Sequence, residues 1–203
     1  MPHTFRFFGT PDRKDSSRIV LKDEEAHHAL HVVRIKVGDA VDVFDGLGNE
    51  WACTVEAANR REVECVVQSR RVEVRPEPRV TVSVAWLNKD RAVEELIQRC
   101  TEIGVGEFRF FRGDHSSRAP KQTDKWTKWA IESCKQCGRL WLPEFHVTGS
   151  IGDVLNQDEI SIAGLLQDDP VPLRDCLNQT QNVNIIISPE GDFSAEEIAT
   201  LAQ

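Results

Sequence analysis

The chain has 203 residues, of which 40% are hydrophobic and 29% are charged, and its formal net charge is −8. This composition is typical of a folded globular protein and excludes a disordered chain. No run approaches the ~20 consecutive apolar residues of a membrane span, and the N-terminus lacks the pattern of a secretory signal. We therefore expect a cytoplasmic protein that does not enter a membrane.

The positive charge is concentrated in one part of the chain. Residues 1–139 contain 24 Lys and Arg against 22 Asp and Glu, whereas residues 140–203 contain 1 against 11. Within residues 109–139 the count is 8 against 3. Because local positive charge attracts phosphates, this segment indicates either a polyanion-binding surface or an ordinary solvated helix face.

The first 75 residues are predicted to form mostly strands. The predicted strands alternate in polarity or are rich in β-branched residues, and they cover 18–21, 39–46, 50–58 and 62–74. One predicted helix, 23–34, interrupts them, with Asp23 as its N-cap. We expect a small β-barrel-like domain over 1–75, ended by the proline-bearing segment 75–79.

The pattern then changes to alternating strands and helices, and a second domain is predicted over 76–203. Strands are expected at 80–86, 105–112, 159–167 and 183–188, and helices at 89–104, at 121–139 and from Ser194. In the first helix the expected buried face is Val93, Leu96, Ile97, Cys100 and Ile103. This alternation predicts a parallel α/β sheet, whose ligands bind at the carboxyl ends of the strands.

One such end is the turn that follows Ile187. Its residues are Ser188, Pro189, Glu190 and Gly191, and a capping box of Ser194 and Glu197 opens the next helix. A strand followed by a tight turn and a helix start directs backbone N–H groups at a ligand, although the pattern is common. The sequence contains no P-loop, no G-x-G-x-x-G motif and no G-x-S-x-G motif.

The segment HHALH places His27, His28 and His31 within five residues, followed by Arg34 and Lys36. The spacing of His27 and His31 suits a metal pair, but no third ligand is evident and we expect no metal. Histidines and cations beside a β-domain suit contacts to RNA better. A surface helix without a ligand is the alternative.

Six cysteines in a chain without a secretory signal are expected to be reduced. Cys134 and Cys137 form a C-x-x-C motif, yet a zinc site would need a second pair of ligands. A redox pair would stand at a helix start after a strand, whereas this motif lies deep in a predicted helix. We therefore interpret both as ordinary helix residues.

Five segments occur in the order and spacing of one known family: HHALHVVRIKVGD, DGLGNEW, DRAVEELIQRCTEIGV, KWAIESCKQCGR and SPEGDFSAEEI. Together they resemble the bacterial 16S ribosomal RNA uridine-N3 methyltransferases of the SPOUT superfamily, from Arg6 to the end of the chain. The resemblance implies an N-terminal PUA-like β-barrel that binds RNA and a C-terminal α/β trefoil-knot domain that binds S-adenosylmethionine. It also implies a homodimer that methylates N3 of one uridine of 16S ribosomal RNA within the small ribosomal subunit, without a metal.

The resemblance assigns residues to two sites. The cofactor would be lined by Leu166, Ile187, Ser188, Pro189, Glu190 and Gly191. For RNA contact, the resemblance points to Arg6, Arg34, Lys36, Gln136 and Arg139. The histidine segment adds His27 and His28 to this set, and the basic segment adds Arg118. Gln136, Gly138 and Arg139 match a Gln-x-Gly-Arg element near the active-site cleft.

The sequence departs from the family at several positions. Ser188 stands where the family usually has glycine, Asp192 where a second glycine is common, and His31 where arginine is frequent. A serine with negative φ fits, so cofactor binding is expected to survive the first change. The family continues past this helix with a Leu-Gly-x-Arg-Ile-Leu-Arg-x-Glu-Thr-Ala segment that completes the knot and is not in this sequence. We therefore expect the 203-residue form to fold yet to bind S-adenosylmethionine poorly.

Methylation at N3 of uridine requires removal of a proton or stabilisation of the developing anion. Without the family's terminal segment no catalytic base is assigned, and Arg139 and Glu190 remain candidates for orienting the substrate. Two other functions stay open: an RNA-binding ribosome-assembly factor without catalysis, and a metal- or redox-linked regulator built on HHALH and the C-x-x-C motif. Metal analysis and the gene sequence past Gln203 would separate them.

Overall fold

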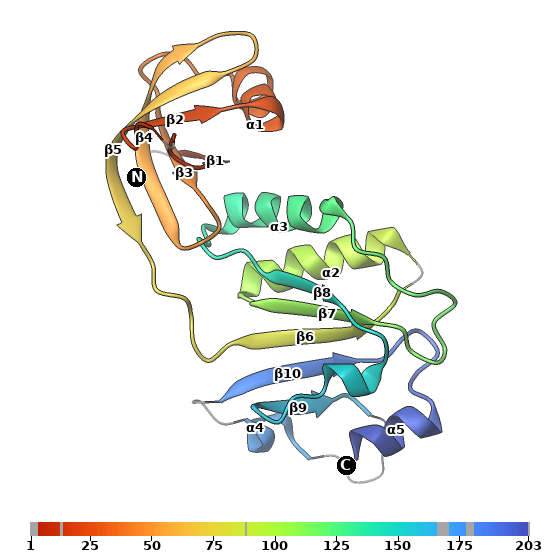
Figure 1. Ribbon diagram of the computed structural model, residues 1–203. Helices are drawn as coiled ribbons and strands as arrows, with labels where there is room; N and C mark the ends of the chain where they lie inside the picture. Colours follow the sequence, from red (N-terminus) through yellow and green to blue (C-terminus); the bar gives the residue numbers. More distant parts are fainter. Residues whose placement is uncertain (1–3, 13, 88, 166–170, 178–180, 203) are drawn as a thin grey trace. The chain divides into compact units, whose positions relative to one another are not determined.

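The structure is a computed structural model that describes residues 4–12, 14–87, 89–165, 171–177 and 181–202 (Figure 1). The chain forms two compact units. Unit 1 comprises Met1–Arg75 and Cys134–Leu142, and unit 2 comprises Pro76–Ser133 and Pro143–Gln203. No helix in the described ranges is long and apolar enough to cross a membrane.

Unit 1 is built on a five-stranded sheet with the strand order β1-β3-β4-β5-β2. The strands are β1 (Phe5–Phe8), β2 (Arg18–Leu21), β3 (Ala40–Phe44), β4 (Asn49–Ala58) and β5 (Val63–Val72). β1 pairs with β3 in parallel and the other pairs are antiparallel. Alternate residues such as Val41 and Val43 are buried in one core. The four predicted strands are present, but β1 was not predicted, because its sequence FRFF contains none of the β-branched residues that mark the equally short β2.

The predicted helix of unit 1 is present as two segments. α1 (Asp23–His27) continues directly into a π-helical segment, η1 (His28–Val33), and Arg34 ends it with φ 62°. The predicted N-cap was wrong: Lys22 occupies that position in extended conformation, without a side-chain cap, and Asp23 is already the first helical residue. A π-helical turn of this kind is frequent at functional sites.

Unit 2 contains a second five-stranded sheet in which every neighbouring pair is parallel. Its order is β8-β7-β6-β10-β9. The strands are β6 (Val80–Ala85), β7 (Glu107–Phe111), β8 (Glu144–Val147), β9 (Glu159–Ala163) and β10 (Asn182–Ile187). The predicted parallel sheet is therefore confirmed, with the short edge strand β8 as an addition.

Helices cover both faces of this sheet (Figure 1). They are α2 (Asp90–Ile103), α3 (Asp124–Cys137), α4 (Leu173–Cys176), α5 (Ala195–Leu201) and the 3-10 segment η2 (Ile151–Val154). On one face Trp126 of α3 packs against Phe110 of β7, with ring centroids 4.6 Å apart. On the other, Phe111 packs with Ile186 and with Ile151 of η2. The last turn of α3, residues 134–137, belongs to unit 1.

The buried face of α2 differs from the predicted one. Val93, Ile97 and Thr101 are buried, at positions i, i+4 and i+8, whereas Ile103 is 77% exposed. Leu96 and Cys100 are half-buried. The prediction for Ile103 was wrong, because the helix ends there and Gly104 turns the chain away with φ 98°.

Candidate functional site

The turn after β10 has the geometry that its residues predict. Pro189 is buried, and its carbonyl accepts a hydrogen bond from the Asp192 N–H at 3.0 Å. The Ser194 hydroxyl accepts from the Glu197 N–H at 3.1 Å, and the Ser194 N–H donates to Glu197 Oε2 at 2.9 Å. The predicted capping box is thus confirmed, and it fixes the start of α5 against the turn.

A second loop, which follows β7, holds this turn in place. His115 Nδ1 donates to the Asp192 carbonyl at 2.9 Å, and the Asp114 N–H donates to Glu197 Oε1 at 3.1 Å. The hydroxyl of Ser194 also donates to the carboxylate of Asp114. A Cβ at Gly191 would lie 3.2 Å from that of His115, so a side chain there would force the loops apart. The two loops therefore form one surface at the carboxyl end of the sheet.

The two departures from the family pattern in the turn after β10 behave differently. Among the described residues, positive φ at non-glycine positions occurs only at Asp23, Arg34 and Asp192, so Ser188 has the negative φ that was expected. Asp192, by contrast, adopts φ 64° in the left-handed region. Aspartate tolerates this region better than most residues, and here its Oδ1 accepts from the Phe193 N–H at 2.8 Å.

The predicted cofactor residues that the structure describes lie together on this turn. Ile187 is 37% exposed, while Glu190 and Gly191 are exposed. Leu166 lies outside the described residues. A cleft of about 300 Å³ adjoins the turn and is lined by Ser161, Ala163, Leu165, Ile186, Ile198, Leu201 and Ala202. None of the predicted residues lines it, but Leu165 and Ile186 immediately precede two of them.

The helical segment of unit 1 exposes the predicted basic positions. His27, Arg34 and Lys36 are exposed, and the rings of His27 and His31 lie in contact with centroids 4.7 Å apart, tilted by 48° to each other. His28 differs, since it is half-buried and packs edge-on against Phe7 at 6.0 Å. His27, Arg34 and Lys36 are therefore better placed than His28 to contact a ligand.

Arg6 has a structural environment that its sequence position does not reveal. Its side chain is only 12% exposed, lies 2.9 Å from Glu50 Oε1, and donates to the Cys134 carbonyl at 2.6 Å. The guanidinium also stands over the ring of Phe44, 4.9 Å from its centroid. Arg6 thus caps the last turn of α3 with most of its hydrogen-bonding groups engaged.

The remaining predicted RNA-contacting residues are divided between the units. Gln136 is exposed and Arg139 is half-buried in unit 1, where the Arg139 carbonyl accepts from Arg6 at 3.5 Å. Arg118 belongs to unit 2, is exposed, and lies 3.5 Å from Asp90. Glu190 lies 3.9 Å from Lys89 in an exposed pair, which contributes little to stability.

The cysteines are six free thiols. Burial raises the pKa of Cys53 and Cys134 to about 12 and that of Cys65 to about 11. Because the thiolate is both the nucleophile and the metal ligand, these three cysteines are poorly suited to redox or metal chemistry at neutral pH. Cys134 and Cys137 lie in α3, as predicted.

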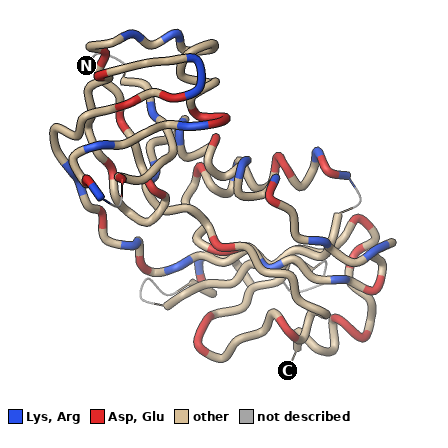
Figure 2. Tube along the Cα trace, turned by 45° about the horizontal axis from the view of Figure 1, so that its top comes forward, with Lys and Arg blue, Asp and Glu red and all other residues tan. Residues whose placement is uncertain are grey.

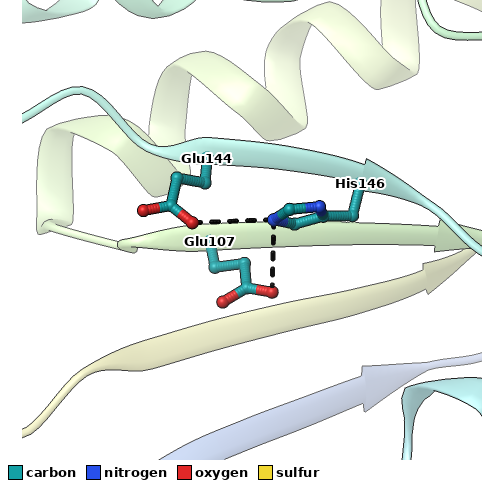
Figure 3. Close-up of side chains that lie close together, drawn as sticks. All are labelled: Glu107, Glu144 and His146. Carbon is teal, nitrogen blue, oxygen red and sulfur yellow. Dashed lines mark ion pairs between the residues drawn. The ribbon is translucent and has the colours of Figure 1, made fainter.

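A charged network at the opposite, amino end of the sheet was not predicted. His146 Nε2 lies 3.7 Å from Glu107 Oε1 and 3.6 Å from Glu144 Oε2 (Figure 3). The ligand atoms of these three residues are within 4.8 Å of one another, as in a metal site. However, Arg79 Nη2 lies 3.3 Å from Glu107 and 3.0 Å from Glu144, and Arg109 Nε lies 2.7 Å from Glu107. Arginines already occupy the place of a cation.

A charged or polar first residue on each of β7, β8, β9 and β10 was the signal that sequence reasoning missed.

Comparison with known proteins gives a consistent result across the chain. A family model described as an RNA methyltransferase domain matches residues 75–203, and one described as an RNA methyltransferase PUA domain matches residues 21–68. The ribosomal RNA small subunit methyltransferase E of Bacillus subtilis is 25% identical over 89% of this chain and 77% of its own.

Solved structures agree with this fold. A probable rRNA-methyltransferase from Porphyromonas gingivalis has a TM-score of 0.83 and 28% identity, covering 98% of this chain and 85% of that one. A ribosomal RNA small subunit methyltransferase E from Neisseria gonorrhoeae, bound to S-adenosyl methionine, has a TM-score of 0.83 and 20% identity, covering 98% and 84%.

Proposed function

The chain belongs to the RNA methyltransferase family, and from this premise we propose that it transfers a methyl group from S-adenosylmethionine to N3 of one uridine in 16S ribosomal RNA. The observation that carries the proposal is the family match over the whole of unit 2's sheet, together with the PUA match in unit 1. The names of the Bacillus subtilis and Neisseria gonorrhoeae relatives support the small ribosomal subunit as the source of the substrate.

We place the methyl donor on the turn after β10, held by Ile187, Ser188, Pro189, Glu190 and Gly191, with Leu166 as a further proposed contact. The residues fit such a ligand. Gly191 is exposed, so its backbone can be reached by a ligand, and the adjoining cleft of about 300 Å³ can accept part of an aromatic ring system. When bound, S-adenosylmethionine supplies an electrophilic methyl group on its sulfonium.

The protein must then prepare the nucleophile. N3 of a neutral uridine carries a proton, and its lone pair is delocalised into the carbonyl groups, so the proton has to leave or the developing anion has to be stabilised. Glu190 is exposed on the turn and is proposed to orient the uridine. Arg139 is proposed to hold the RNA, and no residue is assigned as the base.

RNA binding by unit 1 is proposed to use the exposed side chains of His27, Arg34 and Lys36, with His28, Gln136, Arg139 and unit 2's Arg118 as further contacts. For Arg6 we propose a positioning role, because its guanidinium is engaged by Glu50 and Cys134. Replacing Arg34 and Lys36 together by alanine should flatten the salt dependence of RNA binding by about 1.4–1.8 in log–log slope, as expected for two lost phosphate contacts. Binding of S-adenosylmethionine should be unaffected.

Four further properties belong to the same proposal: a trefoil-knotted methyltransferase domain, a homodimer, a cytoplasmic location and catalysis without a metal. The last follows from the chemistry, because a sulfonium is already an activated electrophile. Transfer should therefore continue after the protein is dialysed against EDTA, and sedimentation should give twice the mass of the chain.

The decisive experiment incubates the product of the complete gene with methyl-labelled S-adenosylmethionine and with small ribosomal subunits from a strain that lacks this gene. We expect label at one uridine, located by mass mapping of the 16S ribosomal RNA. RNA binding without any transfer would instead support an assembly factor without catalysis.

A further inference from the structure

Unit 2 contains a second and larger cleft that none of the assigned residues except Arg118 lines. Its volume is about 660 Å³. Its walls come from Trp86, which follows β6, and from the first turn of α2. The remaining wall residues, 118–119, 121–126 and Trp129, lead into α3 and form its start. It therefore opens beside the carboxyl ends of the central strands, where ligands of parallel sheets bind.

The wall of the cleft is aromatic. Trp86 and Trp126 are buried, 6% and 1% exposed, and their ring centroids are 5.8 Å apart. Trp129 lies one turn further along α3, lines the same cleft, and is only half-buried. A partly exposed indole supported by buried rings is a rigid platform of the kind on which unpaired nucleobases stack.

The rim of the cleft is cationic. Arg118, Lys121 and Lys125 are exposed and line it, against the two carboxylates of Asp90 and Asp124. The nearest of these pairs, Arg118 with Asp90 at 3.5 Å, is exposed and weak. Within the described residues neither Lys121 nor Lys125 has an ion-pair partner, so both ammonium groups are available to an anion. A net positive rim disfavours the sulfonium of the methyl donor and favours phosphate.

Trp86 adds a further feature. Its indole N–H is buried and has no hydrogen-bond partner among the described residues. An indole nitrogen can only donate, and buried donors are usually paired. Because Trp86 also lines the cleft, this unpaired donor belongs to a residue of the cleft wall.

We propose that this cleft receives an unpaired nucleotide of the RNA substrate, with its base against Trp129 and its phosphate between Lys121 and Lys125. The proposal rests on the proposed function, since it takes the substrate to be RNA. It assigns unit 2 its own RNA contact, in addition to those of unit 1.

Oligouridylate of five nucleotides is the probe, and quenching of tryptophan fluorescence is the measurement. Trp129→Ala should weaken binding at least fivefold, since stacking on one aromatic side chain accounts for that much or more. The double variant Lys121→Ala/Lys125→Ala should lower the log–log salt slope by about 0.7, the value for the one phosphate of a single strand that the two lysines hold. Lys128→Ala is the matched control, because Lys128 lies in the same helix but does not line the cleft, and it should bind as the unmodified protein does.

Two outcomes separate this proposal from the proposed function. If the unmodified protein methylates small subunits while Trp129→Ala and the double lysine variant bind oligouridylate and transfer methyl groups normally, the cleft proposal is overturned and the function stands. If the unmodified protein transfers no methyl group, but oligouridylate binding depends on Trp129 and the two lysines, the function fails and the cleft stands. Trp129→Phe keeps a ring in place and should retain binding, which separates loss of stacking from loss of the fold.

Discussion

The two ends of the parallel sheet in unit 2 use charge in opposite ways. At the amino end, Arg79 contacts both Glu107 and Glu144, and Arg109 bridges Glu107 and Glu159. At the carboxyl end, Lys121, Lys125 and Glu190 are exposed around clefts and loops. The same strands run from one end of the sheet to the other, so the difference comes from the side chains and loops that surround the strand ends.

Burial explains this difference. The side chains of Arg109, Glu107 and Glu159 are 15%, 10% and 5% exposed, and charges removed from water must be paired. Burial alone would lower the pKa of Arg109, but hydrogen bonds and charge interactions with the two glutamates outweigh it and raise that pKa. The amino end is therefore a stabilising network, and the carboxyl end keeps charge available for a ligand.

Figure 2 shows how acidic positions dominate the chain towards its C-terminus, where residues 140–203 contain 1 Lys or Arg and 11 Asp or Glu.

The strongest test of this comparison removes the buried cation. Arg109→Met should destabilise the protein by about 3–5 kcal/mol, because buried Glu159 loses its cation and Glu107 keeps only that of Arg79. Urea unfolding monitored by circular dichroism measures the effect. The matched control is Arg99→Met, whose exposed guanidinium lies 3.2 Å from Glu102 and should cost less than about 1 kcal/mol. Equal losses in the two variants would show that the amino-end network contributes no special stability.

A smaller effect is expected at the carboxyl end, where Glu197 joins the two loops. Glu197→Ala should cost about 1–3 kcal/mol, since the N–H groups of Ser194 and Asp114 lose their acceptor. It should also weaken S-adenosylmethionine binding in calorimetry, because the turn after β10 loses its support. Glu196→Ala, in the same helical turn but exposed, is the control. A variant that is destabilised yet binds the methyl donor unchanged would place the ligand elsewhere.

The backbone at Asp192 provides a third test. Asp192→Val should destabilise by about 1–2 kcal/mol, because a β-branched residue resists the left-handed conformation that φ 64° requires. Asp192→Gly should be tolerated far better, since glycine adopts this conformation without steric cost. Thermal unfolding of the two variants checks the order, and a valine variant as stable as the glycine variant would contradict it.

The smallest effect concerns the reactivity of the cysteine thiols. Measured in the variants described above, this reactivity reports whether a substitution disturbs only the part of the molecule around it. With a disulfide reagent at pH 8, the exposed Cys137 should react first. Cys53 and Cys65 should react only on unfolding, because burial raises their pKa values and lowers the thiolate fraction. Cys137→Ser should remove the fast phase. Rapid reaction of Cys53 in folded Arg109→Met would mean that the damage spreads beyond the amino end.

Much of this protein follows from local sequence pattern. The period-two strands of unit 1, the strand and helix alternation of unit 2 and the capping box at Ser194 and Glu197 depend on neighbours within a few residues, and all are present. The turn after Ile187 was predicted as the ligand-binding end of a parallel strand, because any such end faces the same edge of the sheet. The family resemblance, confirmed by the match over 75–203, rested on five local motifs.

Other features depend on residues far apart in the chain, and only the tertiary structure decides them. The family resemblance assigned Arg6 to RNA contact, but its partners in the structure, Glu50 and Cys134, are 44 and 128 residues away and could not be predicted from the sequence. The amino-end network joins the first residues of separate strands, and the tryptophan-lined cleft joins Trp86 to Trp129 across a strand, a helix and a loop. Local pattern determines which elements form, because hydrogen bonding and side-chain period act within a segment. Which charges become buried and paired, and which stay free for a ligand, is set only when the sheet brings those segments together.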